Sequence, residues 1–302
     1  MLDRVEFLQR RKSGIGGSDV AAVLGASPWK TPYQLYKDKT EDYIDVQESD
    51  ILHFGNVLED VIAKEFMRRN GKKVQRSNKL YRHKEHPELI ANIDRRIVGG
   101  GILECKTCSA WASKKFGESG DDVPDQYLLQ CQHYMHVIKV PETTLAVLIG
   151  GNEYREFEIS YHKDLAEFAA NKCVGFWQNH VVPRIPPPAT IGDNLAEYYI
   201  AQSNAKITAT PDVLELIEEL KKLHAEKKRN ELRQEEVTTA IKTFAKENEL
   251  ILDPAGGVVA TWKRGKDRAS VDYKSLLADL GIGEEKINSY TKFSVNRPLK
   301  VK

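Results

Sequence analysis

The stretch NIDRRIVGGGILECKT (residues 92–107) decides the expected fold, because two strand-like runs flank three consecutive glycines. This pattern predicts a β-hairpin whose turn contains Gly99–Gly101. Glu104 and Lys106 are two residues apart, so on a strand their side chains lie on the same face. The turn would bring Asp94, at the end of the preceding strand, next to them. The hairpin therefore predicts a pocket shared by two carboxylates and one lysine.

The two carboxylates predict a metal site. Mg²⁺ and Mn²⁺ accept carboxylate oxygens and fill the rest of their shell with water and substrate phosphate oxygens. The main-chain carbonyl of Cys105 is a candidate third ligand. Such a metal lowers the pKa of the attacking water, and Lys106 could orient that water or help to deprotonate it. This set of residues predicts phosphodiester hydrolysis, although a surface ion pair between Asp94 and Lys106 is an alternative that the spacing leaves open.

A helix is expected on each side of the hairpin, and each helix offers a polar residue to the same pocket. Apolar residues recur at helical spacing over residues 55–69 and again from about 125 to 138. Glu59 on the first helix could hold a second ion, directly or through water. Gln130 on the second helix could position the water or a phosphate. This context favours a functional site over an isolated ion pair.

The segment GIGGSDVAAVLG (residues 14–25) predicts a tight glycine-rich turn followed by a short helix. Ser18 or Asp19 is expected to cap that helix. A helix start of this kind favours an anion such as a phosphate. Trp29 lies just beyond, and it is suited either to stack on a DNA base or to pack as a core aromatic.

A proline-rich stretch marks the expected domain boundary. In PRIPPPATIGDN (residues 183–194), clustered prolines remove hydrogen-bond donors and favour extended backbone. We therefore expect an α/β core over residues 1–185, a linker over 186–210 and a C-terminal extension over 211–302. Apolar residues among dense Glu and Lys at 211–249 predict a long amphipathic helix or a helical hairpin, followed by strands around a small helix.

Composition excludes some classes of function. The chain has 302 residues with 41% hydrophobic content, enough for a substantial core, and it lacks an apolar run long enough to span a bilayer. Its 45 basic and 44 acidic residues give a net charge of only +1, so any DNA binding must come from local clusters. Four cysteines are too few for a disulfide framework. A cytoplasmic location without membrane association is expected.

Cys105 and Cys108 form a CxxC pair, which raises the possibility of zinc or redox chemistry. One such pair would leave zinc half-liganded. Cys105 also alternates away from the acids on its strand. We therefore expect these cysteines to take no part in a zinc site.

Residues 1 to about 185 resemble the lambda-exonuclease and YqaJ-type viral recombinase nucleases of the PD-(D/E)xK superfamily. The resemblance rests on RRKSGIGGSDVAAVLGAS, FGNVLEDVIAKEF, NIDRRIVGGGILECKT and YLLQCQHYM, in the family's order. It implies a restriction-endonuclease-like core, in which helices flank a central mixed sheet. Two departures stand out, because Asn-Ile rather than Pro precedes the first acid and the short lambda-type enzymes lack a counterpart of the C-terminal extension.

The resemblance also implies roles for individual residues. Metal ligands would come from Asp94 and Glu104, joined by the Cys105 carbonyl and by Glu59. Lys106 would be the catalytic lysine, with Gln130 and Tyr127 contributed by the following helix. Arg11 and Ser18 match the pair that holds a 5′-terminal phosphate, a role that suits a guanidinium and a hydroxyl. Two Mg²⁺ ions are implied, and Mn²⁺ can substitute.

The implied activity is 5′ to 3′ digestion of double-stranded DNA ends, which leaves 3′ overhangs for strand annealing. It further implies a phage or prophage protein acting in a bacterial host, a RecT-like annealing partner, and a homo-oligomer in the form of a trimeric ring. Two alternatives remain at this point. One is a structure-specific or nicking endonuclease on the same fold, and the other is a DNA-binding assembly protein in which residues 211–249 act as a coiled coil.

Overall fold

The computed structural model describes residues 4–41, 49–118, 120–199, 205–266, 270–291 and 298–301. The chain divides into two compact units, Met1–Leu195 and Ala196–Lys302. The division follows the proline-rich stretch directly. Each unit is described by itself below.

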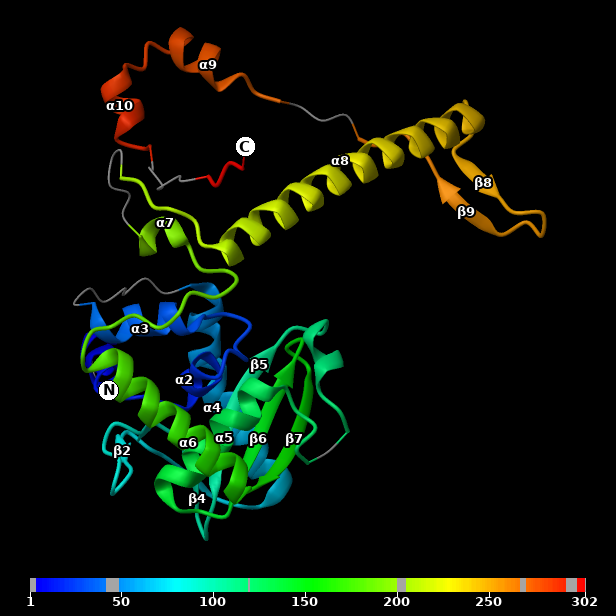
Figure 1. Ribbon diagram of the computed structural model, residues 1–302. Helices are drawn as coiled ribbons and strands as arrows, with labels where there is room; N and C mark the ends of the chain where they lie inside the picture. The colour runs from blue at the N-terminus through cyan, green and yellow to red at the C-terminus, as the bar shows by residue number, and fades with distance from the viewer. Residues whose placement is uncertain are drawn as a thin grey trace. The chain divides into compact units, whose positions relative to one another are not determined.

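The first unit is a mixed α/β structure, as its sequence pattern predicts (Figure 1). Its main helices are α1 (Arg4–Lys12), α2 (Gly17–Val23), α3 (Pro32–Thr40), α4 (Asp50–Asn70), α5 (Asp125–Ile138) and α6 (Lys163–Phe176), which runs on into a π-helical turn, Trp177–Val181. A 3₁₀ turn covers Ala112–Lys115. Its strands are β1 (Val74–Arg76), β2 (Tyr81–Arg82), β3 (Ile90–Ala91), β4 (Arg95–Ile97), β5 (Ile102–Cys108), β6 (Glu142–Ile149) and β7 (Glu153–Ser160).

Five strands form the central sheet in the order β1-β4-β5-β6-β7. The pair β5 and β6 is parallel and its neighbours are antiparallel, so the sheet is mixed. The crossover between the parallel strands contains α5, as a parallel connection requires. Helix α4 is the helix expected before the hairpin. It is capped at its C-terminus by Gly71, whose φ of 66° lies in the left-handed region.

The hairpin differs from its prediction in one detail. Its second strand is β5 and its turn contains the three glycines, with Arg95 opposite Leu103. Its first strand, however, is the short β4, because Ile90–Ala91 pairs with β2 in a separate small sheet. Backbone hydrogen bonds to Ile15 keep that segment out of the central sheet. Asp94 therefore lies just before β4 instead of ending a strand.

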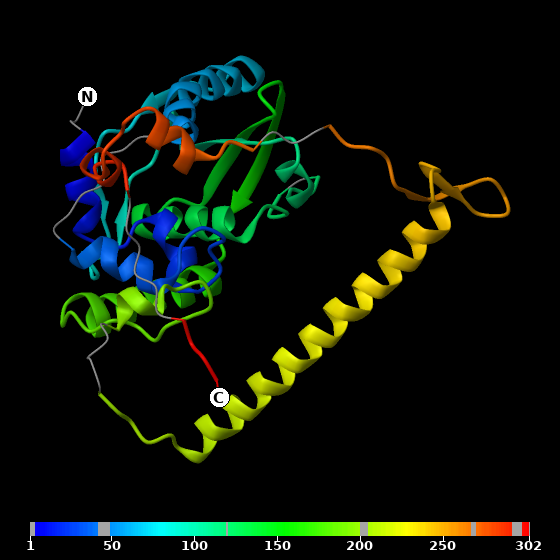
Figure 2. The ribbon, with the colours of Figure 1, turned by 90° about the horizontal axis from the view of Figure 1, so that it is seen from above.

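Helices cover both faces of the central sheet (Figure 2). On one face Phe66 of α4 packs with Leu103 and Cys105 of β5. On the other face Met135 of α5 packs with Leu145 and Val147 of β6. Because side chains alternate along β5, Glu104 and Lys106 lie on the face opposite Cys105. They are therefore presented toward α5.

The second unit contains one long helix, so the hairpin alternative for residues 211–249 is wrong. Its elements are α8 (Pro211–Ala245), the antiparallel pair β8 (Leu250–Leu252) and β9 (Val258–Thr261), α9 (Tyr273–Asp279) and α10 (Glu284–Asn288), while the short α7 (Leu195–Tyr198) lies at the boundary. Pro211 at the first helical position suits the start of α8. None of the described helices combines the length and apolar content that crossing a bilayer needs.

Candidate active site

Asp94, Glu104 and Lys106 come together at the centre of the sheet. The backbone N–H of Cys105 donates to Asp94 Oδ2 at 2.9 Å, which holds this carboxylate beside β5. Lys106 Nζ donates to Glu104 Oε1 at 2.6 Å. The pocket of two carboxylates and a lysine that the hairpin predicts is therefore present in the structure.

Gln130 joins this group from α5. Its Nε2 donates to Glu104 Oε1 at 2.6 Å and to the Tyr134 hydroxyl at 2.9 Å. Sequence reasoning missed Tyr134, although its position one helical turn after Gln130 was a usable signal. Both residues are buried. Gln130 thereby fixes the position of the Glu104 carboxylate.

The other oxygen of Glu104 lacks a partner. Glu104 is only 1% exposed, and its Oε2 is a buried atom without a hydrogen bond. A buried carboxylate oxygen left unsatisfied is costly in an apolar surrounding. This atom is suited to a cation, which would supply the missing partner.

Burial and mutual repulsion shift the protonation of the acids. Burial, followed by the neighbouring Glu104 charge, raises the pKa of Asp94 well above its usual range. Burial also raises the pKa of Glu104, in spite of the opposing effect of Lys106. Burial alone would lower the pKa of Lys106, but the charges of Glu104 and Asp94 outweigh it and raise that pKa. A cation between the acids would relieve their repulsion.

The side chains alone do not make a complete metal cage. Within the part of the chain that the structure describes, no three His, Cys, Asp or Glu side chains converge as they would around a metal. Burial raises the pKa of the Cys105 thiol, which faces α4, so only its main-chain carbonyl is a candidate ligand. Two carboxylates and one carbonyl fit Mg²⁺, which keeps several waters and shares its shell with substrate oxygens.

The contacts of Glu59 differ from those expected of a metal ligand. Its carboxylate forms an ion pair with Arg95, and Arg76 lies 3.8 Å from the same oxygen. Arg95 is buried and also pairs with Asp60. The charge of the Glu59 carboxylate is therefore balanced by arginines, whereas the sequence predicts a second metal ion at this carboxylate. Its role as a ligand stays a prediction.

Arg11 and Ser18 contact each other, as a shared phosphate site would require. The Arg11 guanidinium donates to Ser18 Oγ at 2.7 Å. The N-cap of α2 is Gly16, so neither Ser18 nor Asp19 is the N-cap residue, but Asp19 contributes to the cap from the third helical position, where its Oδ2 accepts the Gly16 N–H at 3.0 Å. The Ser18 hydroxyl is therefore left for Arg11.

One cavity of about 330 Å³ connects this pair with the acids. Its walls include Arg11, Ser18, Asp94, Glu104, Lys106 and Gln130. The close approach of α2 to α5 depends on Gly17, where a Cβ would lie 2.5 Å from a ring carbon of Tyr134. Glycine at this position brings the Arg11–Ser18 pair and the acids into a single cavity.

A second cavity of about 370 Å³ shares Ser18, Asp94, Lys106 and Gln130 with the first, so the two form a continuous cleft. Its aromatic wall consists of Trp29 and Tyr127, whose ring centroids are 6.4 Å apart. The Trp29 side chain is 68% exposed, which removes the core alternative for this residue. The cleft therefore combines charged groups with an exposed aromatic face.

A buried ion pair that sequence reasoning missed supports the Arg11 side of the cleft. Lys39 Nζ donates to Asp19 Oδ2 at 2.7 Å and to the Arg11 carbonyl at 2.8 Å. Both side chains of the pair are about 5% exposed. Burial would raise the pKa of Asp19, but Lys39 and then Arg11 outweigh it and lower this pKa to about 2.

Comparison by sequence identifies a family model and a relative. Residues 6–146 match the YqaJ-like viral recombinase domain. A Bacillus subtilis (strain 168) protein named uncharacterized protein YqaJ is 39% identical over 209 residues, which cover 68% of this chain and 65% of that protein. The match thus spans less than two thirds of the relative's length.

Comparison by structure identifies the fold. An alkaline exonuclease (LHK-Exo) from Laribacter hongkongensis gives a TM-score of 0.52 at 17% identity, over 60% of this chain and 94% of that chain. A structure of LHK-Exo in complex with dAMP gives a TM-score of 0.51 at the same identity and coverage. At this level of identity, the likeness is one of fold.

Proposed function

We propose that this chain is a metal-dependent exonuclease acting on the ends of double-stranded DNA, and the match of residues 6–146 to the YqaJ-like viral recombinase domain supports the proposal. The observation that carries the proposal is the single cavity that holds Arg11 and Ser18 together with Asp94, Glu104 and Lys106. A terminal phosphate bound by the first pair would place the neighbouring phosphodiester bonds close to the acids.

The acid pair and the Cys105 carbonyl would hold a Mg²⁺ ion, for which Mn²⁺ can substitute. Such an ion, when bound, lowers the pKa of an attacking water and neutralises charge on the phosphate oxygens. Glu104 would offer its unpartnered Oε2, since its other oxygen accepts from Lys106 and Gln130. Glu59 could hold a second ion only by exchanging one of its arginine contacts.

The other residues position the reacting groups. Lys106 lies in both cavities of the cleft and carries an ammonium that can orient the attacking water and bind a phosphate oxygen. Gln130 holds the Glu104 carboxylate and can also contact a phosphate. Trp29 and Tyr127 offer rings on which a base can stack. The aromatic wall would hold the strand while the acids and the lysine act on its backbone.

The Arg11–Ser18 pair supports a polarity of digestion. A guanidinium and a hydroxyl side by side bind a phosphate dianion well, because both donate to its oxygens. A dianionic phosphate occurs only at the end of a strand, and DNA ends ordinarily carry the phosphate at the 5′ side and a hydroxyl at the 3′ side. We therefore propose digestion from 5′ to 3′, which leaves a 3′ single strand for a RecT-like annealing protein in phage-type recombination.

A digestion experiment tests the function. The full chain with Mg²⁺ is given three substrates: linear duplex with 5′-phosphate, linear duplex with 5′-hydroxyl, and covalently closed circular DNA. We expect rapid loss of the 5′-phosphorylated strand and an intact circle. Cutting of the circle would instead identify an endonuclease, in which Arg11 and Ser18 contact an internal phosphate.

Arg11→Ala is expected to slow digestion of 5′-phosphorylated ends by about ten-fold or more, because one charge-assisted contact to phosphate contributes about 1.5–3 kcal/mol. Digestion of 5′-hydroxyl ends should change little. Rates on the two matched duplexes measure the effect. Arg10→Ala is the control, since Arg10 pairs with Glu6 on the exposed side of α1. An equal loss on both ends would remove the proposed phosphate role of Arg11.

Asp94→Asn is expected to weaken Mn²⁺ binding by about ten-fold or more, because the affinity of such sites follows the charge of their ligands. Paramagnetic resonance of free Mn²⁺ measures binding directly, without relying on cleavage. Glu158→Gln is the control, because Glu158 is an exposed carboxylate on β7. Unchanged binding in Asp94→Asn would place the metal elsewhere.

A further inference from the structure

Helix α8 carries a heptad seam, apolar toward both ends of the helix and polar at its centre, that the nuclease proposal does not use. Its seam positions alternate in steps of three and four residues, which is the heptad spacing of coiled coils. These positions are Val213, Leu216, Leu220, Leu223, Lys227, Asn230, Gln234, Val237, Ile241 and Phe244. The heptad pattern extends over the whole 35-residue helix. A seam of this length is the sequence signature of helix pairing.

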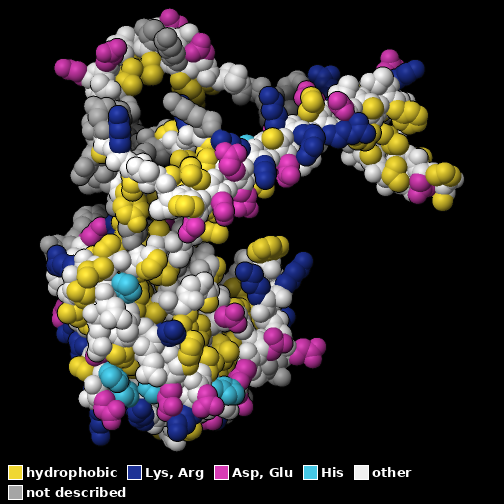
Figure 3. Space-filling model, viewed as in Figure 1, with side chains coloured by type: hydrophobic (Ala, Val, Ile, Leu, Met, Phe, Trp, Pro, Cys, Tyr) yellow, Lys and Arg dark blue, Asp and Glu magenta, His cyan; other side chains and the backbone are white. Residues whose placement is uncertain are grey.

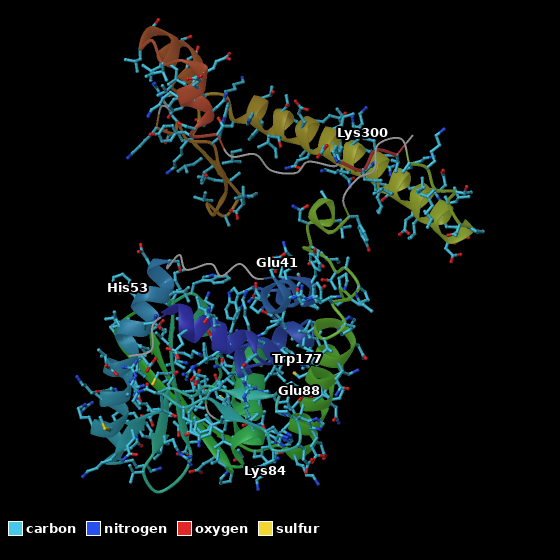
Figure 4. All side chains as sticks on the ribbon, turned by 90° about the vertical axis from the view of Figure 1, so that its left-hand side faces the viewer. Glu41, His53, Lys84, Glu88, Trp177 and Lys300 are labelled. Atoms are coloured by element: carbon cyan, nitrogen blue, oxygen red, sulfur yellow. The ribbon has the colours of Figure 1, made fainter. Side chains whose placement is uncertain are left out.

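The apolar members of the seam are exposed, except Leu220, which is partly buried. Leu216 is 62% exposed, Leu223 51% and Phe244 75%. Side chains project on all sides of α8 (Figure 4), and Figure 3 shows hydrophobic side chains between charges of both signs along it. A helix in a protein gains most of its stability from packing an apolar face against another element. Helix α8 is about 50 Å long, and a second helix of similar length would bury the exposed apolar residues of its seam.

The polar centre of the seam decides between two ways of pairing α8 with a second copy. In a parallel pair, each seam residue meets its own copy, so Lys227 would face Lys227 of the second copy. Glu226 would also flank Glu231 of the second copy, which places like charges together. Both contacts oppose a parallel arrangement.

An antiparallel pair removes both conflicts. The centre of this pair lies midway between Lys227 and Asn230. A seam residue before this centre then faces the seam residue of the second copy that lies equally far beyond it, so Lys227 faces Asn230 of the second copy. The same register places Leu216 opposite Ile241, and Leu220 opposite Val237. Every apolar seam residue except Leu223 meets an apolar partner, and Leu223 meets Gln234.

The flanking residues also favour the antiparallel pair. In that register, Glu226 lies beside the opposite charge of Arg233 of the second copy, and His224 lies beside Glu231 of the second copy, to which its ring can donate a hydrogen bond. Each contact occurs twice by symmetry. We propose that α8 forms an antiparallel coiled coil with α8 of a second copy of this chain, which joins two nuclease units.

Cross-linking of full-length chains tests the orientation. Chains with Leu216→Cys and chains with Ile241→Cys are oxidised separately and as an equilibrated mixture. The proposal expects a disulfide only in the mixture, between positions 216 and 241, because equivalent positions lie about 37 Å apart in the antiparallel pair. Disulfides within each separate sample would indicate a parallel pair and overturn the proposal. The unmodified chain controls for its own four cysteines.

A charge exchange tests the same register without new cysteines. Glu226→Lys, or Arg233→Glu, should lower the dimerisation constant by about ten-fold, and the double variant should restore it. The two residues lie about 10 Å apart along their own helix, so recovery requires contact between copies. Arg229→Glu, which makes the same change away from the seam, is the control. Sedimentation equilibrium measures the unmodified chain and these four variants, and the proposal fails if the double variant dimerises as weakly as the single ones.

Discussion

Lys106→Ala is expected to reduce DNA cleavage by at least about 10²–10³-fold, because removing one charged group that stabilises the transition state has effects of this size. DNA binding should remain, since Arg11 and the aromatic wall of the cleft are untouched. Cleavage is measured in Mg²⁺ on 5′-phosphorylated duplex. Binding is measured on the same duplex without metal, so that no cleavage occurs.

The matched control for this experiment is Lys114→Ala, because Lys114 is an exposed lysine of the same unit. It should leave cleavage unchanged within about two-fold, as expected for a residue without a role in the chemistry. Full activity of Lys106→Ala in Mg²⁺ would refute the assigned centre. Loss of both binding and cleavage would show that Lys106 acts in holding DNA.

Asp19→Asn is expected to destabilise the first unit by about 3–5 kcal/mol, because removal of one partner leaves a buried charge without its counter-charge. The ammonium of Lys39, whose side chain is 4% exposed, would lose its charged partner at 2.7 Å. Urea unfolding at neutral pH measures the loss. The control is Asp38→Asn, an exposed acid of α3 paired with Lys30, which should cost less than about 1 kcal/mol.

A second substitution separates the ion pair from simple loss of a side chain. Replacing Lys39 with Met as well as Asp19 with Asn removes the unpaired charge, so the double variant should be more stable than Asp19→Asn alone. If the double variant were no more stable than the single one, the buried charge would not be the cause of the destabilisation.

The same pair gives a pH dependence with a defined sign. The pKa of Asp19 falls from 3.8 to about 2 on folding, so its contribution to stability is present above pH 3.8. It is lost as the pH falls toward 2, and it amounts to about 2 kcal/mol. The wild-type chain should therefore lose more stability than Asp19→Asn over this window.

The local elements were predictable because their signals lie within one stretch of sequence. Helix α5 spans Asp125–Ile138, as its apolar spacing predicts, and the three glycines form the expected turn before β5. From these elements alone, Asp94, Glu104 and Lys106 could be placed together, since a turn and strand alternation determine their proximity. Gln130 followed from the polar face of α5.

The supporting ion pairs were not predictable in the same way. Lys39 lies 20 residues after Asp19, and Arg95 lies 36 residues after Glu59. Charged residues are common in this chain, and a pairing between distant elements leaves no periodic pattern. The N-cap of α2 was missed for a different reason. Gly16 has the extended backbone of an N-cap, but it has no side chain that could identify it as a cap in the sequence.

The hydrogen bonds of Glu104 bear on which ion the proposed centre would select. One carboxylate oxygen accepts from both Lys106 and Gln130, so a single oxygen remains to meet a cation. Calcium takes six to eight oxygens and commonly grips a carboxylate by both of them, whereas magnesium accepts one oxygen per ligand and keeps its waters. In the proposed centre, the geometry of Glu104 would therefore discriminate against calcium, because Gln130 and Lys106 occupy one of its two carboxylate oxygens.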